Sequence, residues 1–173
     1  MKKPNWISIV FITTFMLSIV FSFGTNLLSV HSNTIVTIVI ILAVIAIGIL
    51  FDMIGVATLS ANEKTFHAMS AQKIKGAKTA NKLIKNNVKV SSVCNDIVGD
   101  ICGIVSGGLG AVLAISLSSS LNINITIMTM IVSAVISSLT VGGKAIFKGI
   151  AAKYAEKIVF TISKPLALFE KNK

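Results

Sequence analysis

Charged residues are scarce in this chain of 173 residues, and arginine does not occur in it at all. Only 13% of the residues are charged and 54% are hydrophobic, whereas soluble domains carry about 25% charged residues. That is too little charge for the surface of an ordinary soluble enzyme, and a disordered chain would have the opposite composition. The composition therefore predicts an integral membrane protein.

Two long stretches of the chain have no charged side chain. They are residues 4–51 and 101–143, which are 48 and 43 residues long. A membrane-spanning helix needs about 20 apolar residues, because about 30 Å of hydrocarbon is crossed at about 1.5 Å per residue. Each stretch therefore holds two spans and a short polar joint. We predict spans at residues 6–28, 35–57, 97–117 and 125–143, joined at residues 29–34 and 118–124.

Two other interpretations of these stretches stay open. Buried helices of a soluble fold are one, although uncharged stretches beyond 40 residues are hard to bury in so short a chain. A signal peptide is the other, formed by Lys2, Lys3 and the apolar residues that follow. That apolar stretch is long for a signal peptide, and no clear small-x-small cleavage site follows it.

The lysines indicate the orientation of the spans. All 16 lie in three segments, residues 2–3, 64–89 and 144–173, and with the neighbouring acids these segments carry +2, +3 and +5. Four spans put the three basic segments on one side of the membrane and both uncharged joints on the other. The positive-inside rule then places both termini in the cytoplasm. We expect a multi-pass protein of the plasma membrane.

In residues 62–92, apolar and polar residues recur at helical spacing. The segment should therefore form an amphipathic pair of helices, broken near Gly76. One face carries Lys78, Lys82, Lys85 and Lys89, and the other carries Ala77, Ala80, Leu83, Ile84 and Val88. We expect the apolar face to lie on the bilayer, with the lysines among anionic headgroups. The lysines could equally serve only to set the topology. Nucleic acid is not an expected partner, because arginine and interleaved aromatic residues are missing.

The sequence offers little for catalysis. His31 and His67 are predicted on opposite sides of the membrane. Cys94 and Cys102 lie about 12 Å apart along one predicted helix, too far to form a disulfide. We therefore expect neither an enzyme nor an organic cofactor, with a membrane-bound enzyme as the weaker alternative.

Acidic and amide side chains near the ends of two spans point to an ion. An acid at membrane depth is costly and usually faces the interior of a helix bundle or an ion path. Carboxylate and amide oxygens are also the ligands that Mg²⁺ prefers. The candidate metal ligands are Asp52, Asn95, Asp96 and Asp100, the last two acids being one helical turn apart. Alternatively, these acids pair with Lys144 or Lys89, or lie wet at the headgroup level.

A stripe of small residues recurs every four positions in the third span. It consists of Gly99, Gly103, Gly107 and Ala111. Such stripes let helix backbones approach closely in lipid, so we expect tight packing here against another helix of the chain or of a second copy.

Four short segments follow one another in a familiar order. The chain has FDMIGVA at residues 51–57, KGAKTA at 75–80, CNDIVG at 94–99 and GKAIFK at 143–148, followed by KPL at 164–166. Over residues 35–170 these segments resemble the transmembrane domain of the cyclin M/CorC (CorB) family of magnesium transporters. The resemblance does not extend to the regulatory domains that members usually carry. We expect one all-helical membrane domain over residues 1–173: an extra span at 1–30, then a family-like region at 31–173 with a juxtamembrane helix pair and a basic C-terminal helix.

The resemblance implies a homodimer that transports Mg²⁺. In the family, the ion is held by two Ser, an Asn and a Glu, and those places are taken here by Asp52, Ile54, Asn95 and Lys144. The Lys144 ammonium would repel Mg²⁺ and act as a tethered cation against Asp52 or Asp96. Two functions follow: transport or efflux of a divalent cation, or a non-transporting accessory role in a chain that kept the fold and lost the metal site.

Overall fold

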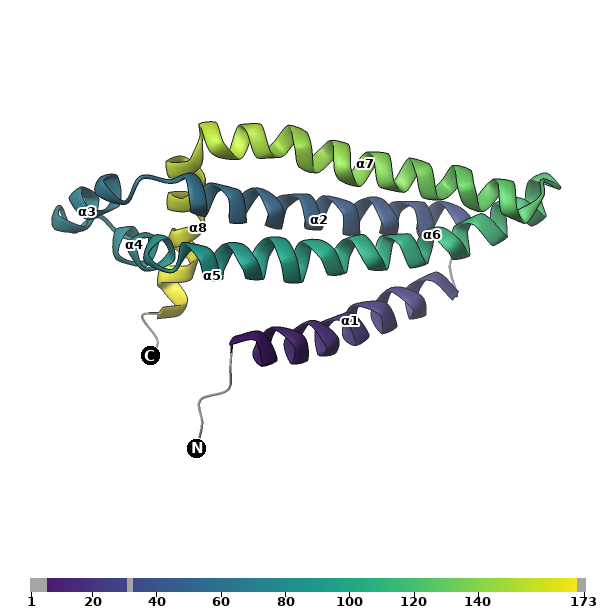
Figure 1. The fold of residues 1–173 in the computed structure, drawn as a ribbon, viewed down its shortest axis with the longest axis horizontal. Helices are drawn as coiled ribbons and strands as arrows, with labels where there is room; N and C mark the ends of the chain where they lie inside the picture. The colour runs from purple at the N-terminus through teal and green to yellow at the C-terminus, as the bar shows by residue number, and fades with distance from the viewer. Residues whose placement is uncertain (1–5, 31–32, 171–173) are drawn as a thin grey trace. The chain divides into compact units, whose positions relative to one another are not determined.

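The computed structural model describes residues 6–30 and 33–170, and within them every regular element is a helix (Figure 1). The all-helical prediction is therefore confirmed. The lysines at positions 2, 3, 171 and 173 and joint residues 31–32 lie outside the described residues. The helices are α1 (Trp6–Val30), α2 (Thr34–Ser60), α3 (Glu63–Ala71), α4 (Ala77–Lys85), α5 (Asn87–Ser92), α6 (Asp100–Leu121), α7 (Ile125–Lys153) and α8 (Ala155–Glu170), with a π-helical segment, η1 (Val93–Gly99), between α5 and α6.

Four helical stretches of the described chain are long and apolar enough to cross a membrane, as predicted. They are α1, α2, the continuous stretch Asn87–Leu121 and α7. The second polar joint is shorter than expected, because its serines belong to α6. Ser119 and Ser120 donate hydrogen bonds back into this helix, Ser120 Oγ to the Ser116 carbonyl at 2.9 Å. Asn122 ends α6 with a left-handed backbone at φ 54°, a conformation that asparagine tolerates.

The chain divides into two compact units, and the first consists of Met1–Ile49 and Ile97–Gly143. Its apolar core is formed by α2, α6 and α7, and includes Ile45, Ile101, Leu109 and Val132. Small residues let these helices approach closely. A Cβ at Gly110 would collide with Ile136, and a Cβ at Gly48 would lie 2.9 Å from Cys102 Cβ. Lipid gives helices little hydrophobic reason to associate, so such close packing holds them together.

The predicted glycine stripe takes part in this packing only at one end. The carbonyl of Gly99 lies 3.6 Å from the Cβ position of Gly48. Cβ positions at Gly103 and Gly107 meet no atom within 4 Å, and Ala111 is exposed. Gly110, one residue before the end of the stripe, is a glycine of α6 that lies against α7. Packing of Gly103, Gly107 and Ala111 against a second copy stays a prediction.

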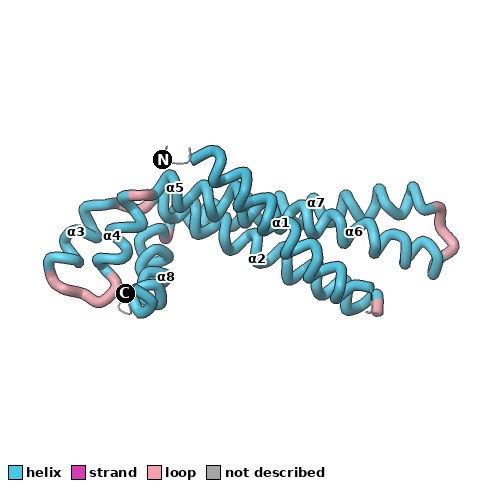
Figure 2. The backbone as a smooth tube through the Cα atoms, turned by 90° about the horizontal axis from the view of Figure 1, so that it is seen from below, coloured by secondary structure: helices cyan, strands magenta, loops and turns pink. Residues whose placement is uncertain are grey.

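The second unit consists of Leu50–Asp96 and Lys144–Lys173. In it, α4 packs against both α3 and α8 (Figure 2). Asn62 begins α3 by accepting a hydrogen bond from the Lys64 amide at 3.0 Å, which satisfies one of the free donors at a helix start. The predicted break at Gly76 is confirmed: this glycine has φ 90° and precedes the first residue of α4. Glycine adopts that angle without steric cost.

We expected the apolar face of the amphipathic segment to lie on the bilayer, but in the structure this face is buried by other helices. Phe66, Ala77, Ala80 and Ile84 are buried inside the second unit, at 0%, 0%, 0% and 4% exposure. The helical pattern correctly indicated an apolar face, but α3 and α8 cover that face before lipid can. Val88, in α5, is 71% exposed. The four lysines Lys78, Lys82, Lys85 and Lys89 are exposed, and their contact with headgroups stays a prediction.

This burial yields a stability prediction. Ile84→Ala should lower the free energy of unfolding by about 2–5 kcal/mol, because it removes a buried side chain and leaves a cavity. Val88→Ala, close by in the sequence but on the exposed side, should change it by about 0.5 kcal/mol or less. Thermal unfolding of both variants in the same detergent measures the difference. Equal losses would show that the segment lies with both positions against detergent or lipid.

Candidate functional site

Among the acids whose burial the structure describes, Asp52 is the buried one. It lies in α2 and is 4% exposed. It stands about 27 Å along the helix from Thr34 at about 1.5 Å per residue, close to the far end of a hydrocarbon layer of about 30 Å. A carboxylate at that depth is strongly destabilising unless cations or hydrogen-bond donors neutralise it.

Two lysines on α7 supply the positive charge. Lys144 Nζ lies 3.9 Å from Asp52 Oδ1, and Lys148 Nζ lies 3.7 Å from Asp52 Oδ2. The two lysines are four residues apart, so they share one face of the helix. The Lys144 side chain is 20% exposed and that of Lys148 is 52% exposed. Their ammonium groups are ion-pair neighbours of the carboxylate, at distances longer than a hydrogen bond. The structure therefore confirms, for Asp52, the alternative in which a predicted acid pairs with Lys144.

Asn95 reaches the same face of α2 from the π-helical segment. Its Oδ1 lies so close to Gly55 that a Cβ on that glycine would overlap it. Gly55 follows Asp52 by three residues, so both lie on one side of α2. The Asn95 amide nitrogen lies 3.2 Å from Ser91 Oγ, to which it donates a hydrogen bond. Asn95 therefore lies beside the turn of α2 that carries Asp52, so the structure brings these two predicted ligands to one face of the helix.

Two oxygens of this site have no hydrogen-bond donor. They are Asp52 Oδ2 and Asn95 Oδ1, both buried. A buried acceptor without a partner costs about 1–3 kcal/mol, so each is a place where water or a cation would be stabilised. Carboxylate and amide oxygens are the donor set of hard cations such as Mg²⁺. The pair thus has the right chemistry for part of a coordination shell, in competition with the two ammonium groups.

The other two predicted acids are exposed. Asp96 is exposed, and its Oδ2 accepts a hydrogen bond from Ser92 Oγ at 2.8 Å. Asp100 is exposed and belongs to the first unit. Within residues 6–30 and 33–170, no three His, Cys, Asp or Glu side chains gather closely enough to hold a metal ion. Cys94 and Cys102 are free thiols, as their spacing predicts.

The π-helical segment explains why regular helical spacing did not predict the relative positions of Asp96 and Asp100. A π turn closes hydrogen bonds five residues apart and so accommodates one extra residue in a helix. It covers Val93–Gly99, which includes Asn95 and Asp96. Residues before and after it are therefore not in the register of one continuous α-helix, and Asp96 and Asp100 are not one regular turn apart.

Sequence reasoning missed two members of the site, Gly55 and Lys148. A signal existed for both. Lys148 follows Lys144 at the spacing of one helical turn, and Gly55 follows Asp52 on the same face. Neither spacing says which residue of another helix stands opposite, so the contacts themselves required the structure.

A comparison with protein families finds a match to most of the chain. Residues 38–171 match the family model of the cyclin M transmembrane N-terminal domain. The match begins inside α2, so α1 lies outside it, and it includes every residue of the site described above. No curated protein matches the chain.

The contact between Gly55 and Asn95 can be tested by adding one methyl group. Gly55→Ala should displace the Asn95 side chain and lower the free energy of unfolding by about 1–3 kcal/mol, the usual cost of overpacking. Gly149→Ala is the matched control in the same unit, because its Cβ position meets no atom within 4 Å. That variant should be neutral or gain up to about 1 kcal/mol from helix propensity. Thermal unfolding that gives the two variants the same midpoint would contradict the contact.

Proposed function

The chain belongs to the cyclin M transmembrane N-terminal domain family, and from this membership and the buried oxygens of Asp52 and Asn95 we propose that it transports divalent cations, foremost Mg²⁺, across the plasma membrane. Both termini are cytoplasmic in this proposal, since the three lysine-rich segments then lie on the inner side. It includes the homodimer that the family resemblance implies, and it assigns the chain no catalysis and no organic cofactor.

The observation that carries the proposal is the pair of donor-free acceptor oxygens. Asp52 Oδ2 brings a full negative charge, and Asn95 Oδ1 brings a neutral amide oxygen. A Mg²⁺ ion prefers one or two carboxylates and retains several of its water molecules. The site needs to supply only part of the coordination shell, and waters complete it.

The lysines act as the exchangeable counter-charge in this mechanism. Without the ion, Lys144 and Lys148 neutralise Asp52, which makes the empty site stable at membrane depth. A cation that arrives displaces them by Coulomb repulsion, and the half-exposed Lys148 can swing outward to the headgroup level because its long stem reaches the interface. Release of the ion lets the ammonium groups return.

Flux through the site is measured with the full chain in liposomes that contain a Mg²⁺-sensitive dye. The wild type should carry Mg²⁺, and Asp52→Asn should slow the initial rate at least about tenfold, which corresponds to about 1.4 kcal/mol. Lys157→Gln is the control, because it removes one exposed charge of the same unit other than the two lysines paired with Asp52. Wild-type rates in both Asp52→Asn and Asn95→Ala would contradict the proposed site.

A second function is favoured by one specific observation. Two ammonium groups within 4 Å of one carboxylate give the site an excess of positive charge before any ion arrives. A chain in which the lysines have permanently replaced the metal would keep the family fold and act as a non-transporting membrane partner.

Thermal unfolding with Mg²⁺ separates the two functions. A transport site should show a Mg²⁺-dependent rise of the wild-type midpoint over Na⁺ at equal ionic strength, since a ligand at about 100 times its Kd stabilises the protein by about 2.7 kcal/mol. In the second function the wild type shows no rise, and Lys144→Glu gains one because a carboxylate replaces the repelling ammonium. A Mg²⁺-dependent rise of the unfolding midpoint in the wild type, without one in Lys144→Glu, would contradict the second function.

A further inference from the structure

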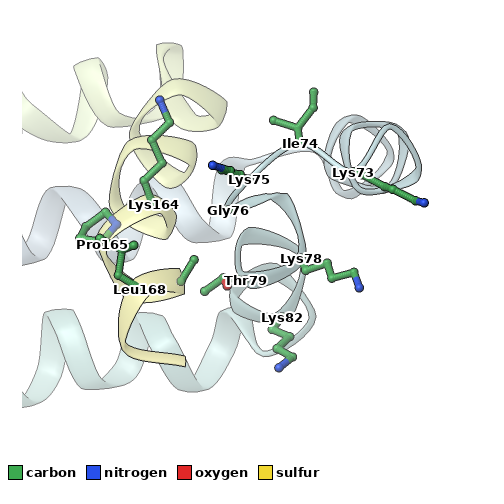
Figure 3. A pocket seen from close by; sticks show the side chains of 11 residues that line it. Lys73, Ile74, Lys75, Gly76, Lys78, Thr79, Lys82, Lys164, Pro165 and Leu168 are labelled. Atoms are coloured by element: carbon green, nitrogen blue, oxygen red, sulfur yellow. The ribbon is translucent and has the colours of Figure 1, made fainter. Parts of the chain in front are cut away.

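A basic cavity lies between α4 and α8, within the second unit and apart from Asp52 (Figure 3). Its volume is about 1090 Å³. Among the described residues that line it, five are lysines, namely Lys73, Lys75, Lys78, Lys82 and Lys164, and none is acidic. Small-molecule pockets usually measure about 300–1,000 Å³, so this cavity is far larger than a simple inorganic ion requires.

Backbone packing creates the concentration of charge. Gly76 has φ 90° and lies against α8, where its Cβ position is 3.3 Å from Ser163 Oγ and 3.4 Å from Lys164 Cγ. This contact brings the lysine before Gly76 to the helix that carries Lys164. Figure 3 shows Lys75 extending from the loop toward α8, whereas Lys73, Lys78 and Lys82 do not extend toward α8. Like charges gathered on one surface repel one another, and an anion among them would relieve that repulsion.

The rest of the lining is apolar and remains uncovered. Ile74 is 37% exposed and Leu168 is 71% exposed, with Pro165 beside them. Lys164 keeps its ammonium 4.6 Å from the centroid of the Phe160 ring, so its aliphatic stem also contributes to the cavity wall. An anion-attracting rim on an exposed apolar surface matches an amphiphile rather than a soluble phosphate.

We propose that this cavity binds an anionic phospholipid, with the phosphate headgroup at Lys75 and Lys78 and the upper part of an acyl chain against Ile74, Pro165 and Leu168. The location fits this occupant. The unit that holds the cavity also holds the ends of two spans, α2 and α7, and the basic segments face the leaflet where anionic lipids are concentrated. The proposed cation transport is not a premise of this site.

The test uses the full chain in an uncharged detergent and native mass spectrometry to count bound lipids. Phosphatidylglycerol should bind at least about tenfold more tightly than phosphatidylcholine with the same acyl chains. The double variant Lys75→Gln/Lys78→Gln should weaken phosphatidylglycerol binding by about 10- to 30-fold, as expected from the contribution of each lysine near an anionic headgroup. Lys75→Arg/Lys78→Arg keeps the charge and should keep most of the binding.

Lys153→Gln/Lys157→Gln is the matched control, because it removes two exposed charges of the same unit that do not line the cavity. An equal loss in this control would mean nonspecific charge attraction and would overturn the proposal. Leu168→Gln tests the acyl-chain contact and should weaken binding of the lipid. Inorganic phosphate that displaces phosphatidylglycerol at equal concentration would assign the cavity to a soluble anion and would likewise overturn it.

Discussion

Hydrocarbon cannot solvate a charged side chain, and this constraint governs where each ionisable residue of the chain stands. The uncharged stretches 4–51 and 101–143 are what remains after charge has been excluded from the depth of the membrane. The ends of α2 and α7 are where charge first becomes tolerable. Asp52 and Lys144 lie there, about 27 Å and 28 Å from the start of their helices at about 1.5 Å per residue. Their similar depth is what allows a carboxylate on one helix to face an ammonium on the other.

The same constraint links the ion pairs to function. A buried acid that two lysines neutralise is stable without a metal, and it also has one oxygen that no hydrogen bond satisfies. In the proposed transport function, cation binding therefore depends on how readily the ammonium groups give way to a divalent cation. The surrounding geometry supports exchange at a fixed place, because Gly55 lets Asn95 approach α2 directly and Ser91 holds the Asn95 amide. The basic cavity at Gly76 is a separate use of lysine, with an anion as its counterpart.

Periodicity and charge were enough to predict the four spans, the break at Gly76 and the position of Asp52 inside the second span, because exclusion of charge from lipid strongly restricts composition. Packing between helices was not predictable to the same degree. The face of α4 that carries Ala80 and Ile84 is apolar, and an apolar face can lie against lipid or against other helices. In the structure it packs against α3 and α8, a contact that the composition of α4 alone does not indicate. The π-helical segment leaves no composition signal of its own, and it shifts the register on which the pairing of Asp96 with Asp100 depended.

The coupling between Asp52 and Lys144 tests most directly whether the lysines of α7 stabilise the buried carboxylate. A double-mutant cycle of Asp52→Asn and Lys144→Gln, followed by thermal unfolding of the full chain in detergent, isolates the pairwise term. We expect each single variant to be destabilised and the double variant to be more stable than their sum by at least about 1 kcal/mol, since residues in one charge network couple by about 0.5–3 kcal/mol. Additive losses would mean that the two charges do not interact, and would contradict a carboxylate stabilised by the lysines of α7.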